Sequence, residues 1–266
     1  MPSPRSDVWA PNPRQLSLLD EVRARGAVSV ERLAQRLDVT MQTVRRDIQR
    51  LTEAGMLDRF NGGVSLPPST TPRLSPAVAW SERQALKADA KARLARSVVG
   101  AVPDGARLML GIGTTVEAVA QALTARKGLH VITHSLHVAQ TLTSHPECTV
   151  EVPAGVVRRR DASLEGPAAE ACLKQSSADI AIISALGVDL DGHLRDRDER
   201  ETPAVQAMLG QARECWLVMD ASKFLADAPV SCAHLRQVQR VFTEALPPAP
   251  LTALMNELGI SLTIAP

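Results

Sequence analysis

The segment from Thr40 to Leu51 constrains the fold of this chain most, because it combines a helix start, one apolar face and one basic face. Thr40 is a good N-cap residue, and Val44 and Ile48 recur with Leu51 at the spacing of a single helical stripe. The opposite face carries Gln, Thr and Arg side chains. Short hydrogen-bonding groups near a helix N-terminus can meet DNA base edges while arginines reach phosphates. The segment therefore indicates a DNA recognition helix, although by itself it fits an ordinary solvated helix about equally well.

The flanking sequence favours a winged helix-turn-helix. Helices are expected at residues 14–25 and 29–37, and Ser29 would cap the second. Residues 56–60 and 63–66 are short extended runs joined by a dipeptide suited to a tight hairpin turn. We therefore expect two helices before the recognition helix and a wing after it. The residues predicted to contact DNA are Ser29, Thr40, Gln42, Thr43, Arg45, Arg46, Arg50, Arg59, Asn61 and Gly62.

Composition narrows the classes of protein to which the chain can belong. The chain of 266 residues has room for two domains, and its net charge of +1 gives no global basic field. The first 66 residues nevertheless contain ten arginines and no lysine against eight acids, so a local patch would steer DNA binding. The four cysteines lack a zinc spacing and are expected to be reduced core residues. No apolar run would span a bilayer and no signal peptide is evident, so we expect a cytoplasmic protein without membrane partner, metal or cofactor.

The sequence pattern changes after a stretch rich in proline, serine and threonine. This predicts a DNA-binding domain at residues 1–66, a linker at 67–80 and a second domain at 81–266. The second domain begins with a long helix from residue 81 to about 100, followed by apolar strands alternating with helices. Strands such as 180–183 are apolar throughout, which predicts an α/β domain with a parallel sheet covered on both faces. The expected strands are 107–110, 130–133, 149–153, 179–184, 215–219, 240–243 and 261–265, and the expected helices between them are 115–124, 136–144, 166–175, 203–213 and 250–258.

A ligand site is expected at the carboxyl ends of these strands. Gly111-Ile112-Gly113-Thr114-Thr115 follows the first strand and opens a helix, so its amides and hydroxyls suit a phosphate group. The run is neither a dinucleotide fingerprint nor a Walker A sequence. Judged by local sequence alone, such a run is somewhat more often a plain strand-to-helix turn than a binding loop. Other polar groups follow later strands, and each alone is more often a cap, a turn or a solvated charge.

Both halves of the chain resemble the DeoR family of bacterial transcription regulators. The family's recognition signature Val-Ser-x-x-Thr-Ile-Arg-Arg-Asp-Leu matches residues 39–48, with Thr40 for Ser, Val44 for Ile and Ile48 for Leu. In the wing, Asn61 replaces a histidine. The second domain resembles the family's sensor domain through Gly-x-Gly-Thr-Thr at 111–115, Thr-x-Ser at 133–135, Gly-x-Asp-x-x-Gly at 187–192 and Asp-x-Ser-Lys-Phe at 220–224.

The resemblance implies a fold shared with ribose-5-phosphate isomerase and a phosphorylated sugar or related metabolite as effector. Residues 112–120 together with 159–161 most resemble the members that respond to glycerol 3-phosphate. Three positions depart from common family residues: His134 for Asn, Ala154 for Gly and Val205 for Lys. The effector-binding residues implied are Gly111, Gly113, Thr114, Thr115, Thr133, His134, Ser135, Arg160, Asp189, Glu201 and Lys223.

Other classes of protein remain open at this point. A sugar-phosphate isomerase would use Asp189 or Glu201 as base and Lys223 for charge stabilisation, but the Lys-Gly-Gly-Gly loop of that enzyme is absent. A Ser-His-Asp hydrolase lacks its Gly-x-Ser-x-Gly motif. A winged-helix activator or an interaction adaptor would share the same motifs.

We therefore expect a homo-oligomer that binds double-stranded operator DNA at a palindrome or repeats. A phosphorylated effector would shift the oligomer between two forms, and it can do so only through a difference in affinity for them. The sequence does not give the sign of regulation; the resemblance implies repression.

Overall fold

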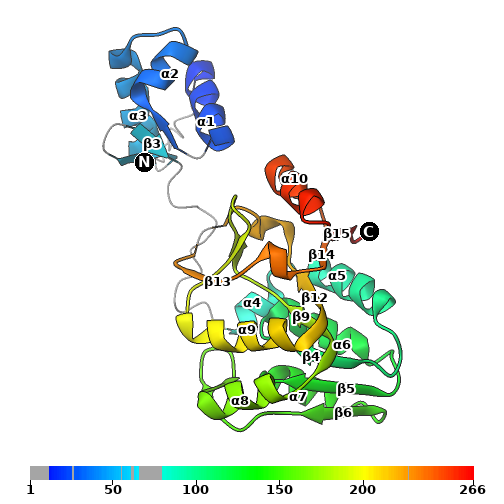
Figure 1. Ribbon diagram of the computed structural model, residues 1–266. Coiled ribbons are helices and arrows are strands. Elements are labelled where there is room, and N and C mark those ends of the chain that lie inside the picture. The colour runs from blue at the N-terminus through cyan, green and yellow to red at the C-terminus, as the bar shows by residue number, and fades with distance from the viewer. Residues whose placement is uncertain (1–11, 26, 55, 61–62, 66–79, 227) are drawn as a thin grey trace, which may run out of the picture. The chain divides into compact units, whose positions relative to one another are not determined.

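The computed structural model describes residues 12–25, 27–54, 56–60, 63–65, 80–226 and 228–266 (Figure 1). The chain forms two compact units, Met1–Pro76 and Ala77–Pro266.

The amino-terminal unit has three helices and a small antiparallel sheet, which confirms the predicted winged helix-turn-helix elements. In chain order these are α1 (Pro13–Arg25), β1 (Ala27–Ser29), α2 (Val30–Arg36), α3 (Met41–Glu53), β2 (Asp58–Phe60) and β3 (Gly63–Ser65). The strand order is β1-β3-β2. The sequence did not predict β1, because three residues are too few to show an alternating pattern. The core between the helices includes Leu18, Leu33 and Leu51, all fully buried.

The carboxyl-terminal unit is built on a parallel sheet of seven strands, which confirms the predicted α/β class. Its strand order is β15-β14-β12-β9-β4-β5-β6, with β4 near the middle. The bounds are β4 (Arg107–Leu110), β5 (Leu129–Thr133), β6 (Cys148–Glu151), β9 (Ala178–Ile183), β12 (Ala212–Val218), β14 (Arg240–Thr243) and β15 (Ser261–Ile264). All seven predicted strands are present, with ends shifted by at most three residues.

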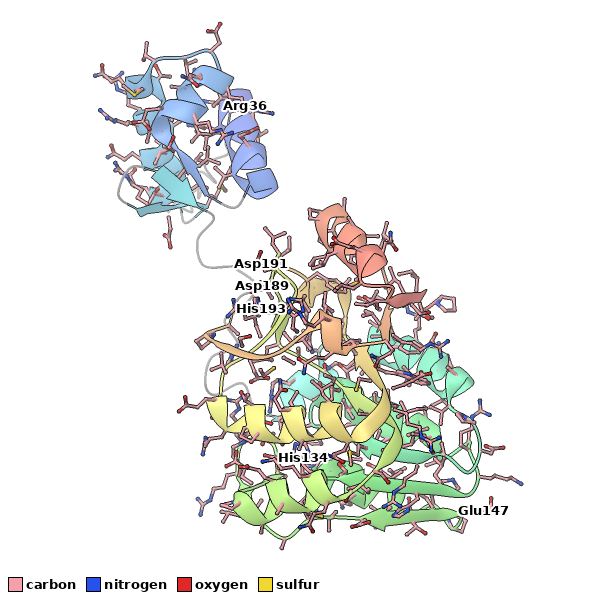
Figure 2. The ribbon with its side chains drawn as sticks, in the orientation of Figure 1. Arg36, His134, Glu147, Asp189, Asp191 and His193 are labelled. Atoms are coloured by element: carbon pink, nitrogen blue, oxygen red, sulfur yellow. The ribbon has the colours of Figure 1, made fainter. Side chains whose placement is uncertain are left out.

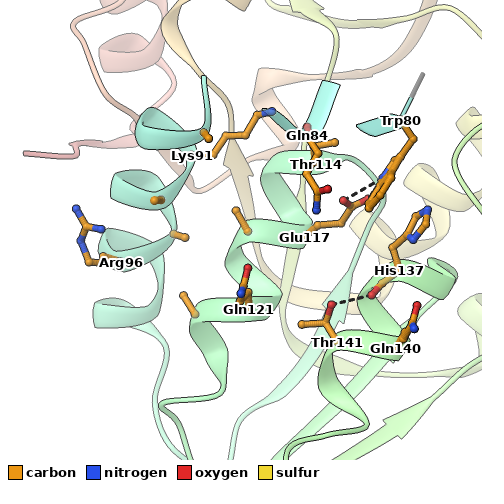
Figure 3. A pocket seen from close by; sticks show the side chains of 15 residues that line it. Trp80, Gln84, Lys91, Arg96, Thr114, Glu117, Gln121, His137, Gln140 and Thr141 are labelled. Atoms are coloured by element: carbon orange, nitrogen blue, oxygen red, sulfur yellow. Dashed lines mark hydrogen bonds between the residues drawn. The ribbon is translucent and has the colours of Figure 1, made fainter. Parts of the chain in front are cut away.

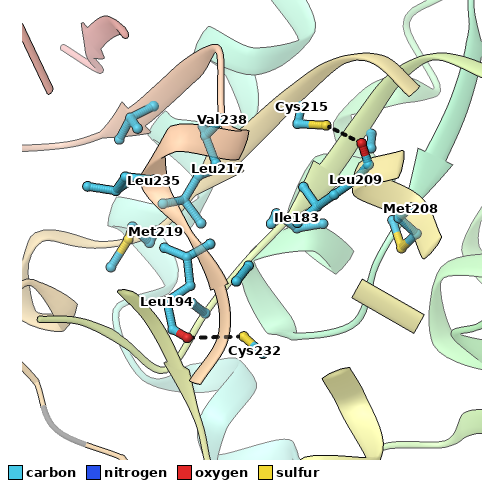
Figure 4. Close-up of a cluster of buried hydrophobic side chains, with 14 of the residues drawn as sticks. Ile183, Leu194, Met208, Leu209, Cys215, Leu217, Met219, Cys232, Leu235 and Val238 are labelled. Carbon is cyan, nitrogen blue, oxygen red and sulfur yellow. Dashed lines mark hydrogen bonds between the residues drawn. The ribbon is translucent and has the colours of Figure 1, made fainter. Parts of the chain in front are cut away.

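Helices cover both faces of this sheet and enclose two apolar cores. The helices are α4 (Trp80–Ala85), α5 (Ala88–Ala101), α6 (Thr114–Leu123), α7 (Leu136–Leu142), α8 (Pro167–Gln175), α9 (Thr202–Gln211) and α10 (Ala249–Glu257). Buried side chains of α5, α6 and α7 form one core with the sheet. The other core includes residues of α8, α9 and α10, with Met208 and Leu217 among its members (Figure 4).

Short antiparallel strands and 3-10 helices between the main elements were not predicted. They are β7 (Val156–Arg158) with β8 (Ser163–Glu165), the three-stranded sheet of β10 (Gly187–Val188), β11 (His193–Asp196) and β13 (Val230–His234), and the 3-10 helices η1 (Glu199–Glu201), η2 (Ala221–Lys223) and η3 (Leu235–Gln237). Strands of two to five residues between turns carry too little periodicity to be recognised. The helices η1 and η2 carry Glu201 and Lys223, two of the residues predicted to bind the effector.

The single helix expected from residue 81 to about 100 is wrong. The structure divides it into α4 and α5, and Lys87 between them has a left-handed backbone with φ 56°. No glycine or proline marks this break in the sequence, so helix propensity alone could not reveal it. The Lys87 ammonium binds the Asp220 carboxylate at 2.7 Å, a contact with a residue 133 positions away. Trp80, the last residue of the predicted linker, is the first residue of α4.

Two expectations from composition can be compared with the structure. All four cysteines are free, as expected, but only Cys215 and Cys232 are buried, whereas Cys148 and Cys172 are partly exposed. Among the described residues, no helix has both the length and the apolar composition needed to cross a membrane.

The packing around Gly187 gives a test of the small sheet. A Cβ added there would overlap the backbone carbonyl of Ala226, whereas one added at Gly100 meets no atom within 4 Å. We expect Gly187→Ala to lower the free energy of unfolding by about 3 kcal/mol, at the upper end for overpacking. The matched Gly100→Ala, within helix α5, should raise it by roughly 0.5 to 1 kcal/mol. Urea unfolding of both variants checks this, and equal stabilities would contradict it.

Candidate DNA interface and effector site

Helix α3 presents the predicted basic face to solvent. Thr40 caps the helix by accepting a hydrogen bond from the Thr43 amide at 3.2 Å, and the two hydroxyls lie 2.9 Å apart. The buried stripe contains Val44, Ile48 and Leu51, as expected. The exposed side chains on α3 include Gln42, Arg45, Arg46, Gln49 and Arg50.

The buried stripe also contains a carboxylate, Asp47, which is 4% exposed. It accepts hydrogen bonds from Arg14 Nε at 2.6 Å and from Gln15 Nε2 at 3.0 Å. These bonds tie α3 to α1 and so fix the direction in which the arginine face points. No role was predicted for Asp47, although an acid on an apolar stripe indicates a buried partner.

The remaining predicted DNA contacts lie outside α3. Ser29 caps α2 by accepting from the Arg32 amide at 3.3 Å. Arg59 is exposed on β2. Asn61 and Gly62 lie outside the described residues, so the predicted hairpin turn stays a prediction.

In the carboxyl-terminal unit, the loop after β4 opens helix α6 without a side-chain cap. Its N-cap residue Gly113 has φ 110° and ψ 149°, a backbone region open essentially to glycine alone. A Cβ at Gly111 would lie 3.4 Å from the Ile182 carbonyl, so the loop passes close to β9. The hydroxyl of buried Thr115 has no hydrogen-bond partner among the described residues. The start of α6 therefore offers amide and hydroxyl donors to a ligand, together with the positive end of the helix dipole.

The polar residues at the end of β5 and directly after it divide into two groups by what they already bind. The Thr133 hydroxyl donates to the Leu110 carbonyl at 2.7 Å, and Ser135 caps α7 at the Val138 amide. His134 between them is 2% exposed, and neither ring nitrogen has a partner among the described residues. Burial, together with the nearby Arg158 charge, lowers the pKa of His134 to about 4. A neutral imidazole offers one donor and one acceptor, which matches a ligand hydroxyl.

Cationic side chains surround this edge of the sheet. The Lys223 ammonium donates to the Ser184 hydroxyl at 3.2 Å, and the Ser184 Cβ is the nearest atom to a Cβ built at Gly113. The exposed Arg160 offers its carbonyl to an Arg83 Nη2 at 3.2 Å. Burial lowers the pKa of Lys223, and it lowers that of Arg83, which the Arg160 charge lowers further. Six residues of this region were not predicted to belong to the site: Arg83, Lys87, Lys91, Ser184, Asp196 and Arg197.

The two predicted carboxylates already have partners within the chain. Glu201 is 4% exposed and ion-pairs with buried Arg158. Asp189 accepts from the His193 amide at 2.8 Å and pairs with Arg195 at 2.5 Å. The structure thus groups Lys223 with the Gly111–Thr115 loop through Ser184, whereas it directs Asp189 and Glu201 to other partners.

The hairpin that holds Asp189 also brings Asp191 and His193 close to it (Figure 2). One ligand atom from each of the three residues lies within 4.8 Å of the others. Because the Asp189 carboxylate is already neutralised by Arg195, a metal ion there would have to compete with that pair.

Comparison with known proteins identifies the family. Residues 14–70 match the DeoR-like helix-turn-helix domain, and residues 86–245 match the DeoR C terminal sensor domain. The chain is 36% identical to the HTH-type transcriptional repressor CsqR of Escherichia coli K12, over 95% of both chains. It is 34% identical to the glycerol-3-phosphate regulon repressor of the same organism, over 94% of this chain and 98% of that protein. The chain therefore belongs to the DeoR family of DNA-binding transcriptional regulators and is not an enzyme.

Solved structures similar to this chain include ribose 5-phosphate isomerase A from Methanocaldococcus jannaschii. The match has a TM-score of 0.40 and 19% identity, and it covers 52% of this chain and 55% of that one.

The buried neutral His134 gives a pH prediction. Its pKa of about 4 in the fold lies below the ordinary value near 6.5, so the unfolded chain takes up the proton first. Above pH 6.5 the imidazole is neutral in both the folded and the unfolded chain, so its burial costs no stability. As the pH falls from 6.5 toward 4, the unfolded chain takes up the proton and the free energy of unfolding decreases. Relative to His134→Asn, the parent should lose up to about 1.4 kcal/mol more per pH unit across this window. Urea unfolding at several pH values measures it, and parallel curves would contradict the assignment.

Proposed function

We propose that this chain is a repressor that binds double-stranded operator DNA through α3 and is released by a phosphorylated sugar or glycerol 3-phosphate. One observation carries the effector class: the uncapped start of α6 lies at an edge of the sheet where burial and mutual repulsion already depress the pKa values of cations. A bound dianion would relieve that repulsion, whereas a neutral sugar would not.

The proposed effector pose uses the donors at the start of α6, where the Thr115 hydroxyl has no partner among the described residues and the Thr114 hydroxyl makes only a 3.4 Å bond to the Arg83 carbonyl. The phosphate binds the amides and hydroxyls of Gly113, Thr114 and Thr115, with Lys223 and Arg160 as counter-charges. His134 takes a hydroxyl of the ligand. Thr133 and Ser135 shape the edge through their own hydrogen bonds. We assign Glu201 to holding Arg158, and Asp189 to the hairpin of Arg195, because both carboxylates already have these partners.

The names of the relatives support this assignment. CsqR is a transcriptional repressor, and the second relative is named for the glycerol-3-phosphate regulon. Repression is therefore the proposed sign of regulation, and glycerol 3-phosphate is the first effector to test.

Operator binding by helix-turn-helix proteins usually pairs two recognition helices with two half-sites. We propose a homo-oligomer on a palindromic or repeated operator. The effector releases DNA by binding more tightly to a form whose helices do not match the half-site spacing.

The exposed arginines of α3 test the DNA interface. On operator DNA selected from random sequence, Arg45→Ala or Arg46→Ala should cost about 1 to 3 kcal/mol of binding if the side chain reads a base. If it holds phosphate instead, the loss should be uniform across sequences and the salt dependence shallower. Gel-shift titration measures both. Arg213→Ala is the charge-matched control, because Arg213 is 85% exposed in the other unit, and losses equal to that control would exclude α3 as the reader.

The glycine at the start of α6 tests the effector site. Gly113→Ala puts a side chain in a backbone region open essentially to glycine, so the loop must reshape. The variant should still bind operator but lose both its thermal stabilisation by glycerol 3-phosphate and its release from DNA. Gly105→Ala is the control, since Gly105 also has a positive φ and open space but precedes β4. A Gly113 variant that is stabilised and released like the parent would place the phosphate elsewhere.

A further inference from the structure

Helix α4 lies against the candidate effector site but belongs to neither apolar core. None of its described side chains is fully buried, and Gln84 and Ala85 are exposed. Beside it lies a cavity of about 500 Å³ between α4, α5, α6 and α7, with Trp80, Glu117 and His137 in its lining (Figure 3). The helix is therefore attached mainly by polar contacts, as expected of elements that detach at low cost.

Trp80 attaches the beginning of α4 to two helices. Its indole Nε1 donates to the Glu117 carboxylate at 3.0 and 3.1 Å. The ring stacks on His137, with ring centres 4.1 Å apart and an interplanar angle of 15°. Glu117 is 7% exposed, and burial raises its pKa. Trp80 thus contacts both α6 and α7, the two helices that start at the edge of the sheet where the ligand is proposed to bind.

Arg83 attaches the middle of α4 to the effector site itself. Its carbonyl accepts hydrogen bonds from Lys91 Nζ at 2.5 Å and from the Thr114 hydroxyl at 3.4 Å. Its guanidinium donates to the Arg160 carbonyl, and its Nε is sheltered without a partner among the described residues. One residue therefore touches the proposed phosphate loop with its backbone and the surrounding cations with its side chain.

Lys87 holds the end of this segment in a strained backbone. Its left-handed conformation is costly for a lysine, and its ammonium is anchored on Asp220, three residues from Lys223. The segment from Trp80 to Lys87 is thus fastened at both ends to the edge where the ligand is proposed to bind.

We propose that α4 is an effector-dependent clasp: a phosphorylated ligand favours its docked form, with Arg83 as an additional anion-binding residue. This inference rests on the proposed function. Without an anion, Arg83 is repelled by Arg160 and Lys223; an anion between them reverses that sign and holds α4 in place. Because α4 is the first described element after Ser65, a change in its docking changes where the chain enters the carboxyl-terminal unit. The ligand shifts docking only as far as it binds the docked form more tightly.

Trp80→Leu tests the clasp without touching the ligand-binding residues. Loss of the stack and of the bond to Glu117 should weaken docking, so the full-length variant should need about tenfold more glycerol 3-phosphate for half-release of operator. Its affinity for glycerol 3-phosphate without DNA, measured by calorimetry, should fall by a similar factor. Gln84→Ala is the matched control on the same helix and should respond within about twofold of the parent.

A second variant and two readouts keep the outcomes distinct. Trp80→Phe keeps an aromatic ring but removes the indole donor, so it should shift the ligand concentration for half-release less, in the same direction. If Trp80→Leu does not fold, as judged by circular dichroism, the result for Trp80→Phe tests the clasp. If both Trp80 variants bind and respond like the parent, the clasp is overturned while the proposed function stands. If the parent itself binds no glycerol 3-phosphate, ribose 5-phosphate or inorganic phosphate, both fall.

Discussion

One buried guanidinium organises the effector side of the molecule. The side chain of Arg158 is 6% exposed and forms ion pairs with Asp161, Glu165, Asp198 and Glu201. These acids come from the β7–β8 hairpin and from the segment leading into α9, so one residue joins two parts of the chain that are far apart in sequence. Glu165 and Asp198 also pair with Arg200, but removing Arg158 would leave the buried Asp161 and Glu201 carboxylates without their cation, which is far costlier than losing a surface ion pair.

This network also decides which charges are left for a ligand. Arg158 pairs with acids that could otherwise neutralise neighbouring arginines. One such neighbour is Arg160, two residues later, which is exposed. Arg160 and Arg83 then repel each other next to the uncapped start of α6. An anionic ligand is the simplest partner for these two arginines. In the proposed mechanism its binding also favours docking of α4, because Arg83 belongs to that helix.

Much of the fold was predictable because its signals are local and periodic. The apolar strands near residue 180 and the stripe through Val44 and Ile48 gave correct elements, and the Gly111–Thr115 loop was correctly placed at a strand end. The parts that failed depend on distant contacts. The break at Lys87 is held by Asp220, Asp47 is buried through Arg14, and Glu201 is taken by Arg158. Arg83 lay within what read as one continuous helix, so nothing in its spacing distinguished it from a solvated side chain.

In the proposed mechanism, one anion orders both the phosphate loop and α4. Hydrogen exchange of the full-length chain, with and without glycerol 3-phosphate, measures this in a single experiment through the amides of residues 80–87 and 111–117. We expect exchange to slow in both segments together and at the same ligand concentration. Slower exchange at 111–117 with no change at 80–87 would contradict the coupling, and no change in either segment would contradict the site.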